Sequence, residues 1–188
     1  PDYVTHVMDV DVTFTDFTAD PLELRMSRTS PGRYALHEFA KNVYDVSATD
    51  GAGRRLKVSR TDPYSWRVAG HDGTVKATYT LFADRADGTY SQIDETHAHL
   101  NMPATFMWAK GFDDRAIEVT FRIGDRPWKA ATQLPAAEAP MTFRASNFQY
   151  FMDSPTELSD FATGAQGNVR IVETDGPAAP AKQEANHE

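Results

Sequence analysis

Two histidines two residues apart, His97 and His99, follow a pair of carboxylates, Asp94 and Glu95. Alternate side chains of a strand share a face, so both imidazoles can lie together if this segment is extended. The carboxylates could then complete a metal site built from nitrogen and oxygen ligands, because the chain has no cysteine. The simpler alternative is a polar loop or strand end whose histidines hydrogen-bond to the backbone, since short histidine clusters are weak signals.

A histidine followed directly by a glutamate, His37 and Glu38, is the second candidate. Zinc proteases of the helical type carry two histidines one turn apart with a glutamate beside the first. Lys41 occupies the position of the second histidine, so the HExxH zinc motif is incomplete and we expect the chain to be inactive alone. The pair could act as a general base, but the sequence places no nucleophile beside it, and a histidine with satisfied hydrogen bonds is the simpler interpretation.

The third candidate is the segment from Asp153 to Glu157, in which two carboxylates flank Ser-Pro-Thr. A fixed turn that presents two carboxylates can bind a cation or a free amino group. The competing interpretation is a helix N-terminus, with Asp153 or Ser154 as the cap, Pro155 near the first helical position and Glu157 completing a capping box. The two interpretations are compatible.

The elements that must position these residues are mostly strands, because the dominant hydrophobic period is two. Val4 to Phe14 alternates apolar and polar residues as a half-buried antiparallel strand does. Turn signals such as Asp62-Pro63 and Gly124-Asp125 separate the candidates. We therefore predict an all-β fold, an antiparallel β-sandwich or curved sheet with one or two short helical turns. Further strands are expected at residues 22–26, 44–48, 56–60, 65–69, 75–82, 105–109, 117–123, 141–145 and 169–173.

Helical signal is weak, and it is confined to Ala35–Asn42 and Ser154–Phe161. From Gly176 onward the composition shifts to Pro, Ala, Lys, Gln and Glu without an apolar period, which is typical of a flexible tail or linker. The sequence therefore predicts a β-rich domain over residues 1–161, followed by an extension and flexible tail over residues 162–188.

The composition indicates a protein with a packed core and argues against nucleic-acid binding and membrane-spanning classes. Hydrophobic residues make up 40% of the 188 and aromatic residues 11%, which suffices for a packed core. The formal net charge of -8 argues against a partner with a phosphate backbone, so we expect no nucleic acid. No apolar run approaches the roughly 20 residues that a membrane-spanning helix needs.

Five segments in a fixed order resemble one family. Together they resemble the N-terminal domain of the glycyl aminopeptidases, zinc metallopeptidase family sixty-one, over roughly Tyr3 to Asp160. The resemblance implies a β-rich domain that precedes a thermolysin-like catalytic domain. Zinc and its ligands would belong to that catalytic domain, so no cofactor and no catalytic residue is expected in this chain. The segments are Ser-Pro-Gly-Arg-Tyr (30–34), Glu-Phe-Ala-Lys-Asn-Val (38–43), Thr-Asp-Pro-Tyr-Ser-Trp-Arg-Val (61–68), Asp-Glu-Thr-His-Ala-His-Leu-Asn (94–101) and Met-Asp-Ser-Pro-Thr-Glu (152–157).

The leading hypothesis is a noncatalytic domain that packs on the catalytic domain of a glycyl-aminopeptidase-like enzyme and shapes its substrate cleft. An aminopeptidase must recognise the free N-terminus of a peptide, and we nominate Glu157 for that role, with Asp153 as its neighbour. One alternative is a stand-alone β-sandwich module that binds peptides or a protein through a sheet edge or the Asp94–Asn101 loop. Another is a small metal-dependent hydrolase that uses His97 and His99. Family habit favours a bacterial protein that is periplasmic or exported.

Overall fold

The computed structural model describes residues 1–85, 87–166 and 169–173. It confirms the predicted all-β class, since strands dominate and every strand pairing is antiparallel. Within the described residues no helix is both long and apolar enough to cross a membrane.

The first sheet contains three strands in the order β1 (Val7–Phe14), β6 (Val75–Phe82) and β3 (Val43–Thr49). The sequence of β6 alternates apolar and polar residues from Val75 to Leu81, and its burial alternates with it, because one face of the sheet covers the core. β1 is an edge strand that pairs with β6 over its whole length, from Val7 opposite Phe82 to Phe14 opposite Val75.

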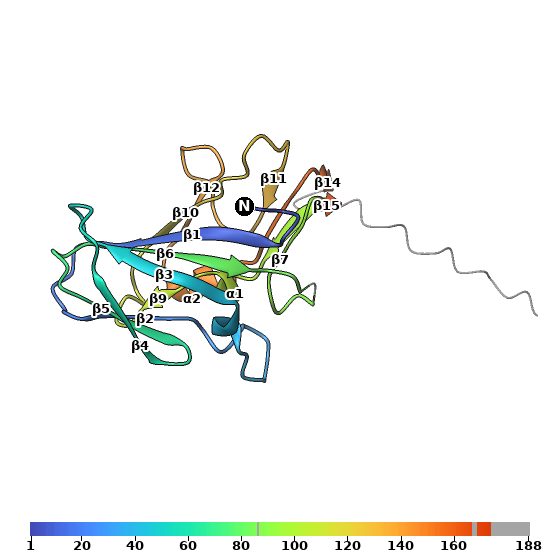
Figure 1. The fold of residues 1–188 in the computed structure, drawn as a ribbon. Coiled ribbons are helices and arrows are strands. Elements are labelled where there is room, and N and C mark those ends of the chain that lie inside the picture. Colours follow the sequence, from blue (N-terminus) through green and yellow to red (C-terminus); the bar gives the residue numbers. More distant parts are fainter. Residues whose placement is uncertain (86, 167–168, 174–188) are drawn as a thin grey trace, which may run out of the picture.

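The second sheet has the order β4 (Lys57–Asp62), β5 (Ser65–Ala69), β2 (Leu22–Arg25) and β9 (Trp108–Ala109). The predicted strand over residues 105–109 is therefore reduced to its last two residues. Figure 1 shows β1, β6 and β3 crossing the middle of the molecule, with β2, β4 and β5 on one side of them.

The third sheet has the order β11 (Lys129–Ala131), β13 (Thr156–Ser159), β8 (His97–Leu100) and β7 (Gln92–Ile93). Two further strand pairs complete the described fold. They are β10 (Ile117–Thr120) with β12 (Thr142–Ala145), and β14 (Ala162–Gln166) with β15 (Val169–Glu173). Val169–Glu173 was predicted as a strand, and the pair with β14 gives backbone structure to the start of the predicted extension. The predicted flexible tail from Gly176 lies outside the described residues.

Helices are short, as predicted, but two of the three differ from the predicted positions. The 3-10 turn η1 (Phe39–Asn42) falls inside the predicted segment, whereas α1 (Met102–Thr105) and α2 (Phe148–Met152) were not foreseen. The helix predicted for Ser154–Phe161 is wrong, because Thr156–Ser159 forms β13. The β-branched Thr156 and the pairing with β8 and β11 on both sides favour the strand there, and Pro155 follows α2 instead of opening a helix.

The turn at Ser30-Pro31-Gly32 has the geometry that its sequence indicates. The N–H of Arg33 donates to the carbonyl of Ser30 at 3.0 Å, and Gly32 has a φ of 73°. Proline at the second position and a positive φ at the third define this kind of turn, and glycine adopts that φ without strain.

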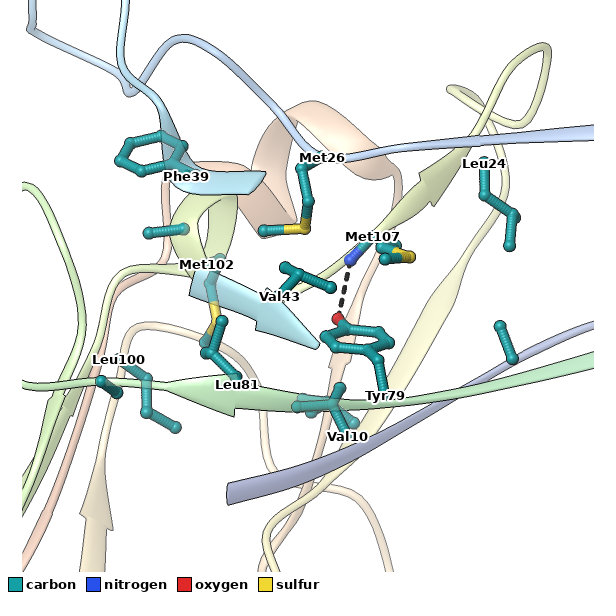
Figure 2. Close-up of a cluster of buried hydrophobic side chains, with 14 of the residues drawn as sticks. Val10, Leu24, Met26, Phe39, Val43, Tyr79, Leu81, Leu100, Met102 and Met107 are labelled. Atoms are coloured by element: carbon teal, nitrogen blue, oxygen red, sulfur yellow. Dashed lines mark hydrogen bonds between the residues drawn. The ribbon is translucent and has the colours of Figure 1, made fainter. Parts of the chain in front are cut away.

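The hydrophobic core lies between the sheets and collects side chains from the first, second and third of them (Figure 2). Its centre is Tyr79 on β6, which is 1% exposed and hydrogen-bonded to the backbone of Met107. Burying a side chain of this size contributes about 1.5–3 kcal/mol, so these residues dominate the stability of the fold. Other buried side chains in the cluster are Val10, Leu24, Met26, Phe39, Val43, Leu81, Leu100 and Met102.

Candidate functional site

The third sheet brings two of the sequence candidates together. Strand β13 runs antiparallel to β8 in a register that places Glu157 opposite His99 and Ser159 opposite His97. The alternating sequence of β8 sends Ala98 and Leu100 into the core, so both histidines lie on the outer face of the sheet. The histidine pair and the glutamate, 58 residues apart, therefore share one surface.

The central contact is between Glu157 and His99, where Nδ1 lies 3.3 Å from Oε2 of the carboxylate. Both side chains are partly buried, with exposed fractions of 23% for Glu157 and 29% for His99. If Nδ1 carries the proton and donates to the carboxylate, Nε2 is left as an acceptor. Among the described residues no partner reaches this Nε2, which is buried.

Gln92 on β7 lies opposite His99 in the register of the sheet. Glu157, His99 and Gln92 therefore form a row across three neighbouring strands, which we call the outer row. Its Nε2 donates to Asp94 at 3.2 Å, and its buried Oε1 has no hydrogen-bond partner in the described part of the chain. Ser159 is 6% exposed, and its hydroxyl likewise has no partner there. The sequence analysis did not single out either residue, and only the pairing of strands far apart in the chain reveals them.

His97 belongs to a local turn. The carboxylate of Asp94 accepts hydrogen bonds from the backbone N–H groups of Thr96 at 2.7 Å and His97 at 3.0 Å. It also accepts from the Thr96 hydroxyl, and its Oδ1 lies 3.3 Å from Nδ1 of His97. Partial burial opposes ionisation of Asp94, but the bonds from Thr96 and His97 outweigh it and hold the pKa of this carboxyl below its usual range. The simpler interpretation of this segment, a polar strand end, fits these contacts.

A metal ion has no ready set of ligands here. In the residues that the structure describes, no group of three or more histidine, cysteine or acidic side chains is arranged to hold a metal. His97 and His99 each contact a different carboxylate, Asp94 and Glu157. The structure therefore gives the small metal-dependent hydrolase no geometric support.

Asp153 lies away from this row, at the end of α2. It is the C-cap residue of that helix, and its backbone carbonyl accepts a hydrogen bond from Gln133. The hydroxyl of Ser154 donates to the carbonyl of Tyr150 at 2.6 Å, which closes the last turn. The interpretation of this segment as a helix N-terminus is wrong, since a helix ends here. The carboxylate of Glu157 contacts His99 instead of pairing with Asp153.

His37 and Glu38 do not form an acid–base pair. The ring of His37 stacks on Phe39 with centroids 5.1 Å apart, and its buried Nε2 has no partner among the described residues. The Glu38 carboxylate turns to Arg28 at 3.3 Å, and the Lys41 ammonium lies over the ring of Tyr90. The stacked, half-buried ring favours a packing role, although its hydrogen bonds are not all satisfied as the sequence analysis expected.

What the outer row can do chemically follows from Glu157. One carboxylate oxygen is held by His99, and no hydrogen bond from the described residues reaches the other. A partly exposed carboxylate that is fixed at one oxygen can accept a charged hydrogen bond at the second, for example from a primary ammonium group. The row therefore presents a fixed carboxylate to a ligand, which suits it to binding a cationic group.

A solved structure shares the fold of this chain. The crystal structure of an aminopeptidase N family protein from Idiomarina loihiensis superposes with a TM-score of 0.81 over 90% of this chain at 22% identity. At this identity the similarity shows the fold alone, and the chain spans 30% of that protein. A comparison with curated protein sequences gives no match.

The sequence itself assigns the family. Residues 1–160 match the family described as the peptidase M61 N-terminal domain, which covers most of the 188-residue chain. The β-rich fold is compatible with a domain of this kind. The chain belongs to the peptidase M61 N-terminal domain family.

Proposed function

We propose that this domain packs on the catalytic domain of a glycyl-aminopeptidase-like zinc metallopeptidase and forms one wall of its substrate cleft. The family match over residues 1–160 is the observation that carries the proposal. Zinc would be held by the catalytic domain, and none of the residues of this chain takes part in the bond cleavage.

A candidate docking surface supports this role. Tyr34 is fully exposed and Leu36 is 65% exposed, and both lie in the loop that joins β2 to η1. Large apolar side chains that protrude together from a loop are typical of a surface that another domain covers. We place the contact with the catalytic domain at this loop.

Glu157 is the residue that we assign to the substrate. An aminopeptidase must bind the α-ammonium group of a peptide, and the half-buried carboxylate of Glu157 has one oxygen available for it. Asp153, at the end of α2, would add to the negative potential without touching the ammonium group. A charged hydrogen bond at this depth is worth about 1.5–3 kcal/mol, which corresponds to roughly a 10- to 100-fold change in binding.

The first experiment reads the natural coding sequence beyond Glu188. A His-Glu-x-x-His motif in the same reading frame is expected, and its absence would overturn the assignment to a peptidase of two or more domains. If it is present, the complete enzyme with Glu157→Gln should lose about 10- to 100-fold in kcat/KM on glycyl p-nitroanilide. Glu138→Gln is the matched control, since Glu138 is exposed and distant in sequence from the row.

A second substrate separates amine binding from a general loss of activity. N-acetylglycyl p-nitroanilide has no ammonium group, so Glu157→Gln should leave its low rate unchanged and reduce the preference for the free amine. Equal losses on both substrates would mean that Glu157 supports the structure of the enzyme and does not bind the ammonium group.

A further inference from the structure

In the described part of the chain, the outer edge of β1 carries backbone N–H and C=O groups without hydrogen-bond partners. The N–H of Ala83 donates to the carbonyl of His6 at 2.8 Å, which fixes the phase of the β1–β6 ladder. Hydrogen-bonded pairs alternate along an antiparallel ladder, so the even-numbered residues of β1 bond to β6. The N–H and C=O groups of Asp9, Asp11 and Thr13 therefore point away from the sheet.

At the start of β1, the outward backbone groups are paired with another extended segment of the chain. Val7 has the same phase as Asp9, and its outward N–H and C=O are both bonded to the backbone of Asp2, at 3.0 and 2.7 Å. Asp2 thus pairs with the outer edge of β1 at its first residue, Val7, and the pairing goes no further along the strand in the described structure. Within the described residues, no hydrogen bond reaches the outward groups of Asp9, Asp11 or Thr13, so three consecutive pairing positions stay open.

Two apolar hollows lie beside this open edge, each with a volume of about 230 Å³. The first is lined by Met8 and Val10, and the second by Val12 and Phe14, which are the inward-facing residues of β1. Both hollows reach Thr120 on β10, so they occupy the space between β1 and a strand of another sheet. Where the two hollows adjoin, their lining residues Val10 and Val12 are two positions apart on β1, and successive same-face side chains of a strand are about 7 Å apart.

We propose that the open edge of β1 binds an extended peptide by strand addition, with apolar side chains at alternate positions filling the two hollows. Backbone groups of the peptide would pair with Asp9, Asp11 and Thr13, which is the general mode of recognition at exposed sheet edges. The exposed carboxylate of Asp9 and the net charge of -8 favour basic residues at the ends of the peptide. This binding site does not depend on the proposed peptidase function.

The ion pair between Arg122 and Asp11, at 2.7 Å, crosses the rim of the hollows. Lys76 also lies 3.6 Å from the same carboxylate oxygen, so Asp11 keeps a cationic partner when Arg122 moves. The Arg122 side chain is 74% exposed, and an exposed ion pair opens at little cost. Arg122→Ala should therefore leave peptide binding intact or strengthen it.

The test uses the full chain and the labelled peptide acetyl-Lys-Thr-Leu-Thr-Leu-Thr-Lys-amide. Its leucines would point into the hollows, and its threonine N–H groups would face β1. The control peptide carries N-methyl groups on the threonines, which keeps the side chains and removes the backbone donors. We expect the control to bind at least about tenfold more weakly in fluorescence anisotropy, because several backbone bonds are lost.

On the protein side, Thr13→Pro removes an outward N–H without breaking the β1–β6 ladder, and Thr13→Val is the matched control. Proline is tolerated at such edge positions, and Thr13 is exposed. Thr13→Pro should weaken binding about tenfold and Thr13→Val should not. If the proline variant does not fold, the comparison of the two peptides on the unaltered chain tests whether backbone pairing contributes to binding.

Amide exchange locates the site independently. Peptide addition should slow exchange at Asp9, Asp11 and Thr13, while Val10 and Val12 are protected throughout by β6. Absence of peptide binding, or equal affinity for the N-methylated control, would overturn the proposal. A β1-mediated dimer that Thr13→Pro abolishes would overturn it too, since a second copy would then be the occupant.

Discussion

The hydroxyl of Tyr79 connects the centre of the first sheet to the segment that follows α1, and its removal is a quantitative test of the core. The hydroxyl donates to the carbonyl of Thr105 at 2.7 Å. It also accepts from the N–H of Met107 at 2.9 Å, the bond drawn in Figure 2. Exposed fractions are 0% for Thr105 and 3% for Met107, so water cannot replace the lost bonds without structural change. Tyr79→Phe therefore leaves two buried backbone groups unpaired.

The expected cost follows from these two groups. Each buried group that loses its partner costs about 1–3 kcal/mol, and the phenylalanine regains part of this because no hydroxyl has to be buried. We expect a net destabilisation of about 2–4 kcal/mol. For a chain of this size that corresponds to a fall in Tm of roughly 6–12 °C.

Urea unfolding followed by tryptophan fluorescence measures this cost, with Tyr44→Phe as the matched control. Tyr44 is 52% exposed, and its hydroxyl has no hydrogen bond in the described part of the chain. A midpoint for Tyr79→Phe equal to that of Tyr44→Phe would refute the reasoning, because the buried bonds would then contribute nothing.

Burial also raises the pKa of Tyr79 above the ordinary value of 10.0. Stability from this group is present below that value and is lost as the pH rises further, so the phenol should ionise only when the chain unfolds.

Three further predictions concern the surface and the turn beside the outer row. Asp94→Asn should destabilise the chain by about 1–3 kcal/mol at pH 7, because the carboxylate caps the turn that begins β8. The folded pKa of Asp94 is depressed, so its contribution is present above the ordinary value of 3.8 and disappears as the pH falls below it. The Tm difference from the unaltered chain should therefore shrink in acid, and a constant difference would contradict this. Tyr34→Ser combined with Leu36→Ser should leave the Tm within about 2 °C, since both side chains are exposed, but should weaken co-purification with a separately expressed catalytic domain. Zinc added to the purified chain should bind substoichiometrically in isothermal titration calorimetry, whereas one tight site abolished by replacing His97 and His99 would restore the hydrolase hypothesis.

The parts of the fold that the sequence predicts are those encoded by local alternation. Residues 75–81 alternate apolar and polar side chains, and β6 (Val75–Phe82) forms with the predicted bounds. The prediction fails at Thr156–Ser159, where four residues are too few for a period to be read and Pro155 resembles a helix start as much as a helix end. Strands β7, β8, β11 and β13 are two to four residues long and are defined by their partners more than by their own sequence.

In the candidate site, too, contacts between residues close in sequence could be predicted, and contacts made by strand pairing could not. The contact of Asp94 with His97 spans three residues, and a turn could have been inferred from the sequence. The contact of Glu157 with His99 spans 58 residues and depends on the register of β13 against β8, which no local pattern specifies. Likewise Gln92 joins the row only because β7 pairs with β8. Residue types could therefore be nominated from the sequence, but their grouping required the sheet.

The two proposed sites lie on opposite faces of the same strands. On β8, His99 faces outward beside Glu157, while Ala98 and Leu100 face inward and line the first hollow. On β13, Leu158 lines that hollow and its neighbour Glu157 does not. Because alternate residues serve the two faces, the sites can be perturbed separately. Thr13→Pro should weaken peptide binding at the β1 edge and leave amine recognition intact, and Glu157→Gln should weaken amine recognition and leave peptide binding intact. If either variant impaired both, the sheet would be transmitting a structural change, and neither loss could be assigned to a direct contact with the ligand.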